Sequence, residues 1–158
     1  MGKTIRLKND IRLDSNNLSL KNKITCAYAG GSMTWDTAWT WVKVPLYGLD
    51  YNGVGFGVSS SNFYVPAKVS LIKVSICFSY YNNDINGGDK NISLYKNGNQ
   101  LAMLAYTNYN ENNYYTSVSG VAVVSVSQND EIAIYINSSK AGTMRLFNCS
   151  RIVIENLT

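Results

Sequence analysis

From residue 24 onward, short runs of alternating apolar and polar residues follow one another along the chain. The longest run covers residues 69–81, where one side of an extended strand carries Ser70, Ile72, Val74, Ile76 and Phe78. Further runs cover residues 42–49, 62–65, 91–95, 100–105, 120–126, 131–137 and 144–154. No segment of helical length repeats its apolar residues with the period of a helix. The pattern therefore predicts an all-β domain, a sandwich or barrel of short strands.

Residues that favour turns separate several of these runs. Asn97-Gly98 stands between two alternating runs and predicts a two-residue hairpin loop, because both of its positions take positive φ. Residues 86–89, Asn-Gly-Gly-Asp, predict a second turn. The glycine-rich residues 53–58 lack the Lys-Ser/Thr ending and the following helix of a phosphate-binding loop. We interpret them as the tip of a hairpin.

Two of the predicted strands are also apolar on their second side. A strand in a chain of this size has a second apolar side only if something covers it, and we expect the cover to be another copy of the chain. The predicted subunit interface comprises the residues on these second sides, Val69, Leu71, Lys73, Cys77, Ala133 and Tyr135.

The first 23 residues differ from the rest in charge and pattern. They hold six basic and two acidic side chains and so carry the whole net charge of +4, whereas residues 24–158 are neutral. They also contain short alternating units, which need partners to bury their apolar side chains; two of these units are made of Ile5, Arg6, Leu7, Ile11, Arg12 and Leu13. We predict a basic arm over residues 1–23, which docks the protein or winds three copies together, and a head domain over residues 24–158. The alternative is a frayed or edge-paired N-terminus.

Composition narrows the choice of partners. Charged residues make up 15% of the chain, and the many Asn, Ser and Tyr residues are typical of β-proteins that touch other surfaces. No apolar run is long enough for a transmembrane helix, and the first ten residues lack the apolar stretch of a signal peptide. We therefore expect synthesis in a cytoplasm and no membrane insertion. Because the head is neutral, it lacks the basic patch of a nucleic-acid-binding protein, and no nucleic acid is expected as a partner.

The residues that carry most enzyme chemistry are scarce. The chain has no histidine, which excludes catalytic triads and dyads that depend on imidazole. A pair of carboxylates could still hydrolyse a glycosidic bond, but the acidic residues stand apart in predicted turns. Oxygen atoms of Asp84, Asn86 and Asp89 suit calcium, yet the spacing favours a solvated turn. We expect no enzyme activity and no cofactor or metal.

Cysteines and aromatic residues have mainly structural interpretations. Cys26, Cys77 and Cys149 are odd in number and far apart, which favours small buried side chains over disulfides or a metal site. Trp35, Trp39 and Trp41 either stack sugars or close the end of a sandwich, and we favour packing. A loop rich in Tyr and Asn has the composition of an adaptable recognition surface. Its candidate ligand-binding residues are Tyr106, Tyr109, Asn110, Tyr114 and Tyr115.

The order of several motifs resembles the tumour necrosis factor and complement-q globular head superfamily. The motifs are Phe63-Tyr64-Val65-Pro66, the apolar strand that ends at Tyr81, Leu94-Tyr95-Lys96-Asn97-Gly98, Ser119-Gly120 with alternating apolar residues, and Asp130-Glu131-Ile132. The resemblance covers about residues 45–155. It implies a ten-stranded jelly roll that forms a homotrimer and binds ligands through its outer face and apical loops. This chain departs from the family pattern at Ala67 and Asn129, where glycine is usual, and has no collagen-like stalk.

Similar trimeric heads occur in bacteriophages. We therefore expect a virion structural protein, a head or tail fibre or capsid decoration subunit, that contacts other virion proteins through its arm and a host surface glycan through its head. The alternatives are a bacterial glycan-binding module or adhesin, and a carbohydrate-active enzyme on the same scaffold.

Overall fold

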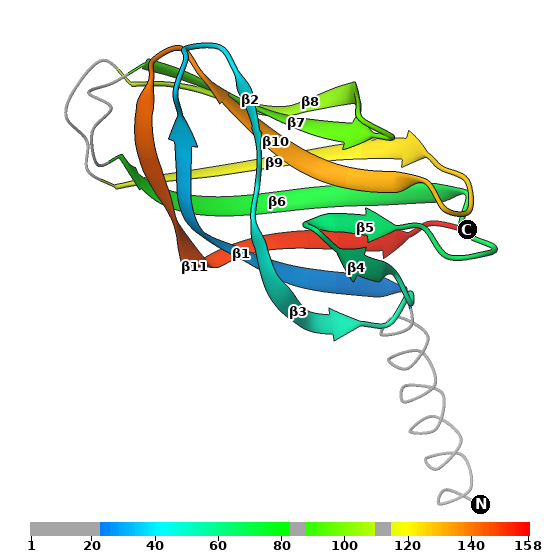
Figure 1. Ribbon diagram of the computed structural model, residues 1–158. Coiled ribbons are helices and arrows are strands. Elements are labelled where there is room, and N and C mark those ends of the chain that lie inside the picture. The colour runs from blue at the N-terminus through cyan, green and yellow to red at the C-terminus, as the bar shows by residue number, and fades with distance from the viewer. Residues whose placement is uncertain (1–22, 83–87, 110–114) are drawn as a thin grey trace, which may run out of the picture.

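The computed structural model describes residues 23–82, 88–109 and 115–158, and this part of the chain is a sandwich of two β-sheets without a helix (Figure 1). It accordingly contains no helix long and apolar enough to cross a membrane. The strands are β1 (Ile24–Trp35), β2 (Trp41–Lys43), β3 (Leu46–Asn52), β4 (Gly57–Ser59), β5 (Asn62–Tyr64), β6 (Leu71–Asn82), β7 (Gly88–Lys96), β8 (Asn99–Tyr109), β9 (Thr116–Ser125), β10 (Glu131–Ser138) and β11 (Gly142–Asn156).

Most neighbours within each sheet are not consecutive in sequence. The first sheet has the order β3-β1-β11-β6-β9 and is called the β6 sheet below. The second, the β10 sheet, has the order β4-β5-β10-β7-β8, with β2 paired to β10. All the described pairings are antiparallel. This crossed-over antiparallel arrangement is a jelly roll, so the predicted fold class is confirmed.

The core lies between the two sheets. Ile72, Val74, Ile76 and Phe78 on β6 are buried, as the alternation predicts, and they belong to one cluster with Ile132, Ile134 and Ile136 on β10. Burying a side chain of this kind typically contributes about 1.5–3 kcal/mol. Facing rows of branched side chains therefore hold the sandwich together.

The alternation of β6 does not extend back to Val69. We expected Val69 on the outer side, but it is only 6% exposed and belongs to the core, whereas Ser70 is exposed. The strand begins at Leu71, and Lys68 has a φ of 68°, so a turn resets the direction of the side chains before the strand starts.

Two segments of the structure differ from the strands that the sequence pattern predicts. β1 was missed because Gly30-Gly31 interrupts its alternation; the strand continues through a bulge between Ala29 and Gly31. The alternation over residues 42–49 predicts one strand, but these residues form parts of β2 and β3, which lie in different sheets on either side of Pro45. Proline cannot donate a ladder hydrogen bond, so it marks the place where the chain leaves one sheet for the other.

Asp130 links two neighbouring loops through hydrogen bonds. Its carboxylate accepts hydrogen bonds from Asn97 Nδ2 and from the Ser127 backbone N–H, each at 2.8 Å. These two bonds lower the pKa of Asp130, and the nearby Lys96 ammonium also contributes. Asn97 and Gly98 take φ of 52° and 78°, which confirms the predicted hairpin. Asn129 has a φ of 68°, a conformation that explains why glycine is usual at this position.

We expect Asp130→Asn to destabilise the fold by about 1–2 kcal/mol at pH 7, because an amide cannot accept both hydrogen bonds. A carboxyl whose pKa is lowered in the folded state stabilises the protein above its ordinary pKa and loses this effect as the pH falls. The difference from the unmodified chain should therefore shrink below about pH 4 in urea denaturation. Asp36→Asn, at an exposed bend, is the control. A difference that stays constant down to pH 3 would contradict the role given to the carboxylate.

The sandwich closes along one edge, where β8 contacts β9. Gly120 on β9 approaches the backbone of β8 so closely that an added Cβ would overlap the carbonyl oxygen of Leu104. A side chain at position 120 would push the two edge strands apart.

Gly120→Ala should therefore cost about 1–3 kcal/mol of stability, as overpacking in a core does. The control is Gly57→Ala on β4, where the added Cβ would meet Tyr64 at an ordinary contact of 3.4 Å. Equal denaturation midpoints for the two variants would show that the edge is looser than described.

Candidate functional site on the outer face of the β6 sheet

The outer face of the β6 sheet carries a row of exposed apolar side chains. On β9 the outward positions include Val121 and Val123, which are 56% and 55% exposed. They lie in register with Ser75 and Lys73 on β6, whose neighbour Leu71 is half-buried. Apolar side chains this exposed on a regular strand, here the edge strand β9, point to a surface that another molecule covers.

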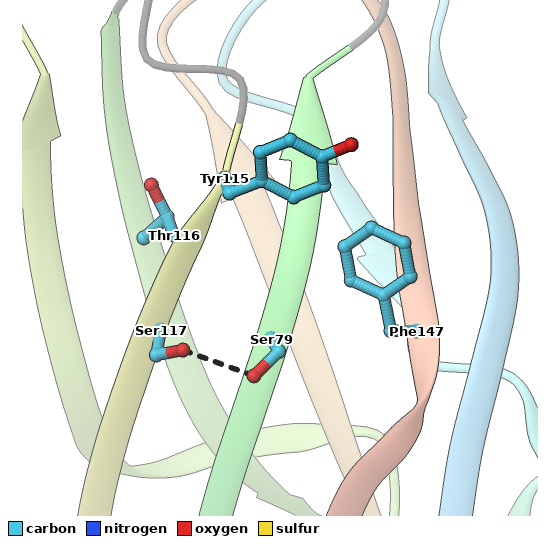
Figure 2. A pocket seen from close by; sticks show the side chains of 5 residues that line it. All are labelled: Ser79, Tyr115, Thr116, Ser117 and Phe147. Atoms are coloured by element: carbon cyan, nitrogen blue, oxygen red, sulfur yellow. Dashed lines mark hydrogen bonds between the residues drawn. The ribbon is translucent and has the colours of Figure 1, made fainter.

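An aromatic group stands at one end of the same face. The rings of Tyr115 and Phe147 stack at 5.8 Å between centroids, and those of Tyr115 and Tyr81 lie 5.4 Å apart. Tyr115 is nevertheless 74% exposed. A pocket of about 260 Å³ is lined by the rings of Tyr115 and Phe147 and by Ser79, Thr116 and Ser117. Figure 2 shows these side chains and the hydrogen bond of 3.0 Å between Ser79 and Ser117. These rings can accept an apolar or aromatic group from a partner.

Two ion pairs lie on this face. Arg151 Nε lies 2.7 Å from the Asp50 carboxylate, and Lys73 Nζ lies 2.8 Å from Glu155. The Arg151 guanidinium also stands over the ring of Tyr28. These two pairs are neutral as units and add no net charge to the face, whereas the exposed Arg145 on β11 adds one positive charge.

The cysteines differ from our expectation of buried side chains. All three are free; Cys77 and Cys149 are exposed and Cys26 is half-buried. Cys77 occupies an outward position of β6, so the apolar run around it does not imply burial. Burial and the neighbouring Asp50 raise the pKa of Cys26, which keeps this thiol protonated at neutral pH.

A second apolar patch lies on the edge strand β8, next to β9. Leu101 and Met103 are 43% and 56% exposed there. The molecule thus presents two apolar patches on neighbouring edge strands of different sheets, Val121 and Val123 on β9 and Leu101 and Met103 on β8. Two different patches favour a head-to-tail contact, in which the β8 patch of one copy packs on the β9 patch of the next.

The predicted interface residues do not form one surface. Leu71, Lys73 and Cys77 lie on β6, whereas Ala133 and Tyr135 belong to β10 in the opposite sheet. Ala133 is buried but lies outside the core cluster. The side chains around Ala133 on this outer side are aromatic. Ala133 lies in register with Tyr95, and the ring centroids of Tyr95 and Tyr135 are 4.3 Å apart. This second apolar side is thus at least partly covered by side chains of the same chain.

The predicted ligand-binding residues are also divided. Tyr106 lies on β8, where its hydroxyl donates to Asp89 Oδ1 at 2.9 Å, while Tyr115 belongs to the aromatic group of the opposite sheet. The structure does not describe Asn110, Tyr114 or the side chain of Tyr109. The predicted turn residues Asp84 and Asn86 also lie outside the described residues. The same holds for the predicted arm residues Ile5, Arg6, Leu7, Ile11, Arg12 and Leu13.

The tryptophans and the glycine-rich segment take structural positions. Trp35 is buried, and its Nε1 donates to the Ile136 carbonyl at 3.3 Å, which agrees with packing; Trp41 packs against Tyr95, whereas Trp39 is exposed. Residues 53–56 connect β3 to β4, and Asn52 Oδ1 accepts from the backbone N–H of Phe56 at 2.9 Å. Among the described residues, no three His, Cys, Asp or Glu side chains gather as metal ligands would.

Neither a protein-family model nor a curated protein matches the sequence. The fold, however, is that of a tumour necrosis factor-like jelly roll, since solved structures of this class superpose on it. Crystal structures of murine APRIL at pH 8.0, 8.5 and 5.0 match with TM-scores of 0.59, 0.56 and 0.61. Each match covers 85% of this chain and 98% of the APRIL chain, at 12–14% sequence identity. The tumour necrosis factor-like fold predicted from the motif order is therefore confirmed.

Proposed function

We propose that this chain is a non-enzymatic virion structural protein, the trimeric head of a bacteriophage fibre or capsid decoration. Its arm over residues 1–23 docks it to other virion proteins, and its head binds the host surface. The observation that carries the proposal is the exposed apolar row on the outer face of the β6 sheet.

The apolar row supports assembly through its energetics. Val121 and Val123 still expose more than half of their surface, so covering them would contribute about 1 kcal/mol each. In a trimer this contact forms three times, and each contact would also cover Leu101, Met103 and the aromatic group of Tyr115 and Phe147. Contacts of this kind suffice for a stable oligomer only when many of them are covered together.

The shape of the two patches supports a ring. Each copy carries one patch on β9 and a different one on β8. If the β9 patch of one copy packs on the β8 patch of the next, three copies close into a ring in which every patch is covered. The resemblance of the sequence motifs to the tumour necrosis factor superfamily favours three as the number.

The positions of the acidic groups support a binding role over catalysis. Asp50 and Glu155 are engaged with Arg151 and Lys73, and Asp130 with loop amides and Lys96. Carboxylates tied in this way are poor acids and nucleophiles. A trimer would instead bind by avidity, since three weak sites on one rigid head raise the apparent affinity by about a hundredfold or more.

Val121→Asp should dissociate the proposed trimer, because three unpaired carboxylates would be buried at the contact. The matched control is Val58→Asp on β4, an exposed valine of the opposite sheet. By light scattering and circular dichroism, Val121→Asp should give folded monomers and Val58→Asp should remain trimeric. A trimer of normal mass for Val121→Asp would show that this face is not the contact.

Deletion of residues 1–23 tests the virion role separately. The truncated head should still assemble, because the proposed contacts lie in the head, but it should be lost from purified phage particles. Incorporation at the normal level would refute the docking arm. A full-length chain that is absent from particles yet binds bacterial surface glycans would favour the adhesin instead.

A further inference from the structure

A lysine is buried inside the sandwich, with no hydrogen-bond partner in the described part of the chain. Lys90 on β7 points to the same side of its strand as Ile92 and Leu94, which belong to the core, and is 1% exposed. Its ammonium nitrogen has no hydrogen-bond partner among the described residues. An ammonium group removed from water is strongly unfavourable unless other groups replace its hydration.

A second unpaired polar atom lies at the same level of the sandwich. Lys90 is in register with Thr107 on β8, and Thr107 contacts the Tyr80 hydroxyl of the opposite sheet at 3.0 Å. Tyr80 is in register with Thr116 on β9, whose buried hydroxyl also has no described partner. In Figure 2 the Thr116 side chain points away from the rings of Tyr115 and Phe147. One layer of this core is thus polar, and it holds two unsatisfied donors.

The charges around this layer favour an anion. The pKa of Lys90 is lowered to about 8, mainly by burial and also by the nearby Lys140 ammonium, while the Asp89 carboxylate acts in the opposite direction. Most copies are therefore still protonated at pH 7. The Asp89 carboxylate is engaged by the Tyr106 hydroxyl. The layer consequently combines a buried positive charge with a free hydroxyl donor.

We infer that this layer binds a small monovalent anion of the halide class, held by the Lys90 ammonium and the Thr116 hydroxyl. An anion satisfies both donors and compensates the buried charge, which water alone does not do. This inference is independent of the proposed virion role, because the layer lies inside each sandwich and uses none of the assembly surface.

The test is the dependence of stability on chloride at constant ionic strength and protein concentration, with potassium gluconate replacing potassium chloride. Above the dissociation constant, each tenfold rise in chloride should lower the unfolding equilibrium constant about tenfold. Lys90→Met should abolish this dependence and still fold, since an unbranched apolar side chain fits the buried position. Lys96→Met on the same strand, a half-exposed lysine paired with Asp130, should retain it.

Two further measurements keep the inference open to refutation. Thr116→Val should raise the dissociation constant for chloride about tenfold, because it removes the second donor. In crystals of the unmodified chain grown with bromide, an anomalous peak should lie beside Lys90 Nζ, and this result needs no variant. Equal chloride dependence in the unmodified chain and Lys90→Met, or no bromide peak at Lys90, would overturn the inference.

Discussion

The apolar core between the two sheets, to which the inner sides of β6 and β10 both contribute, is the packing on which the rest of the molecule depends. Ile72, Val74, Ile76 and Phe78 are buried in this core, and a strand shows alternate residues on opposite sides. Once these four point inward, Lys73, Ser75 and Cys77 must point outward, and the paired positions of β9 must do the same. The outer face of the β6 sheet is therefore a direct consequence of the core.

That face explains why the molecule is better suited to assembly than to chemistry. Its acids are paired with basic groups or used in loops, and its exposed side chains are valines and aromatic rings on regular strands. Rigid strands hold these side chains in fixed positions, so covering them costs little conformational entropy. The net charge of the chain resides in residues 1–23 and leaves the head neutral, which is the basis for proposing a separate docking function for the arm.

Much of the fold could be predicted from the sequence where local rules decide the structure. The alternation in β6 and β10 gave the correct inner faces, and Asn97-Gly98 marked its hairpin because the turn demands positive φ. Alternation failed at Val69, which a turn with positive φ at Lys68 directs into the core, and at β1, which continues through two glycines because it pairs with the distant strand β11. The candidate interface mixed two sheets because alternation reveals the side of a strand but not the sheet that it joins. The burial of Lys90 could not be predicted from the sequence, because a lysine in a turn-rich region is usually exposed.

The central claim is that the outer face of the β6 sheet is covered by sister copies, and the mass of the unmodified chain in solution tests it most directly. Sedimentation equilibrium over a wide range of concentrations should give about three times the chain mass of 17.5 kDa. A single species of 17.5 kDa that persists at the highest concentration would contradict the account.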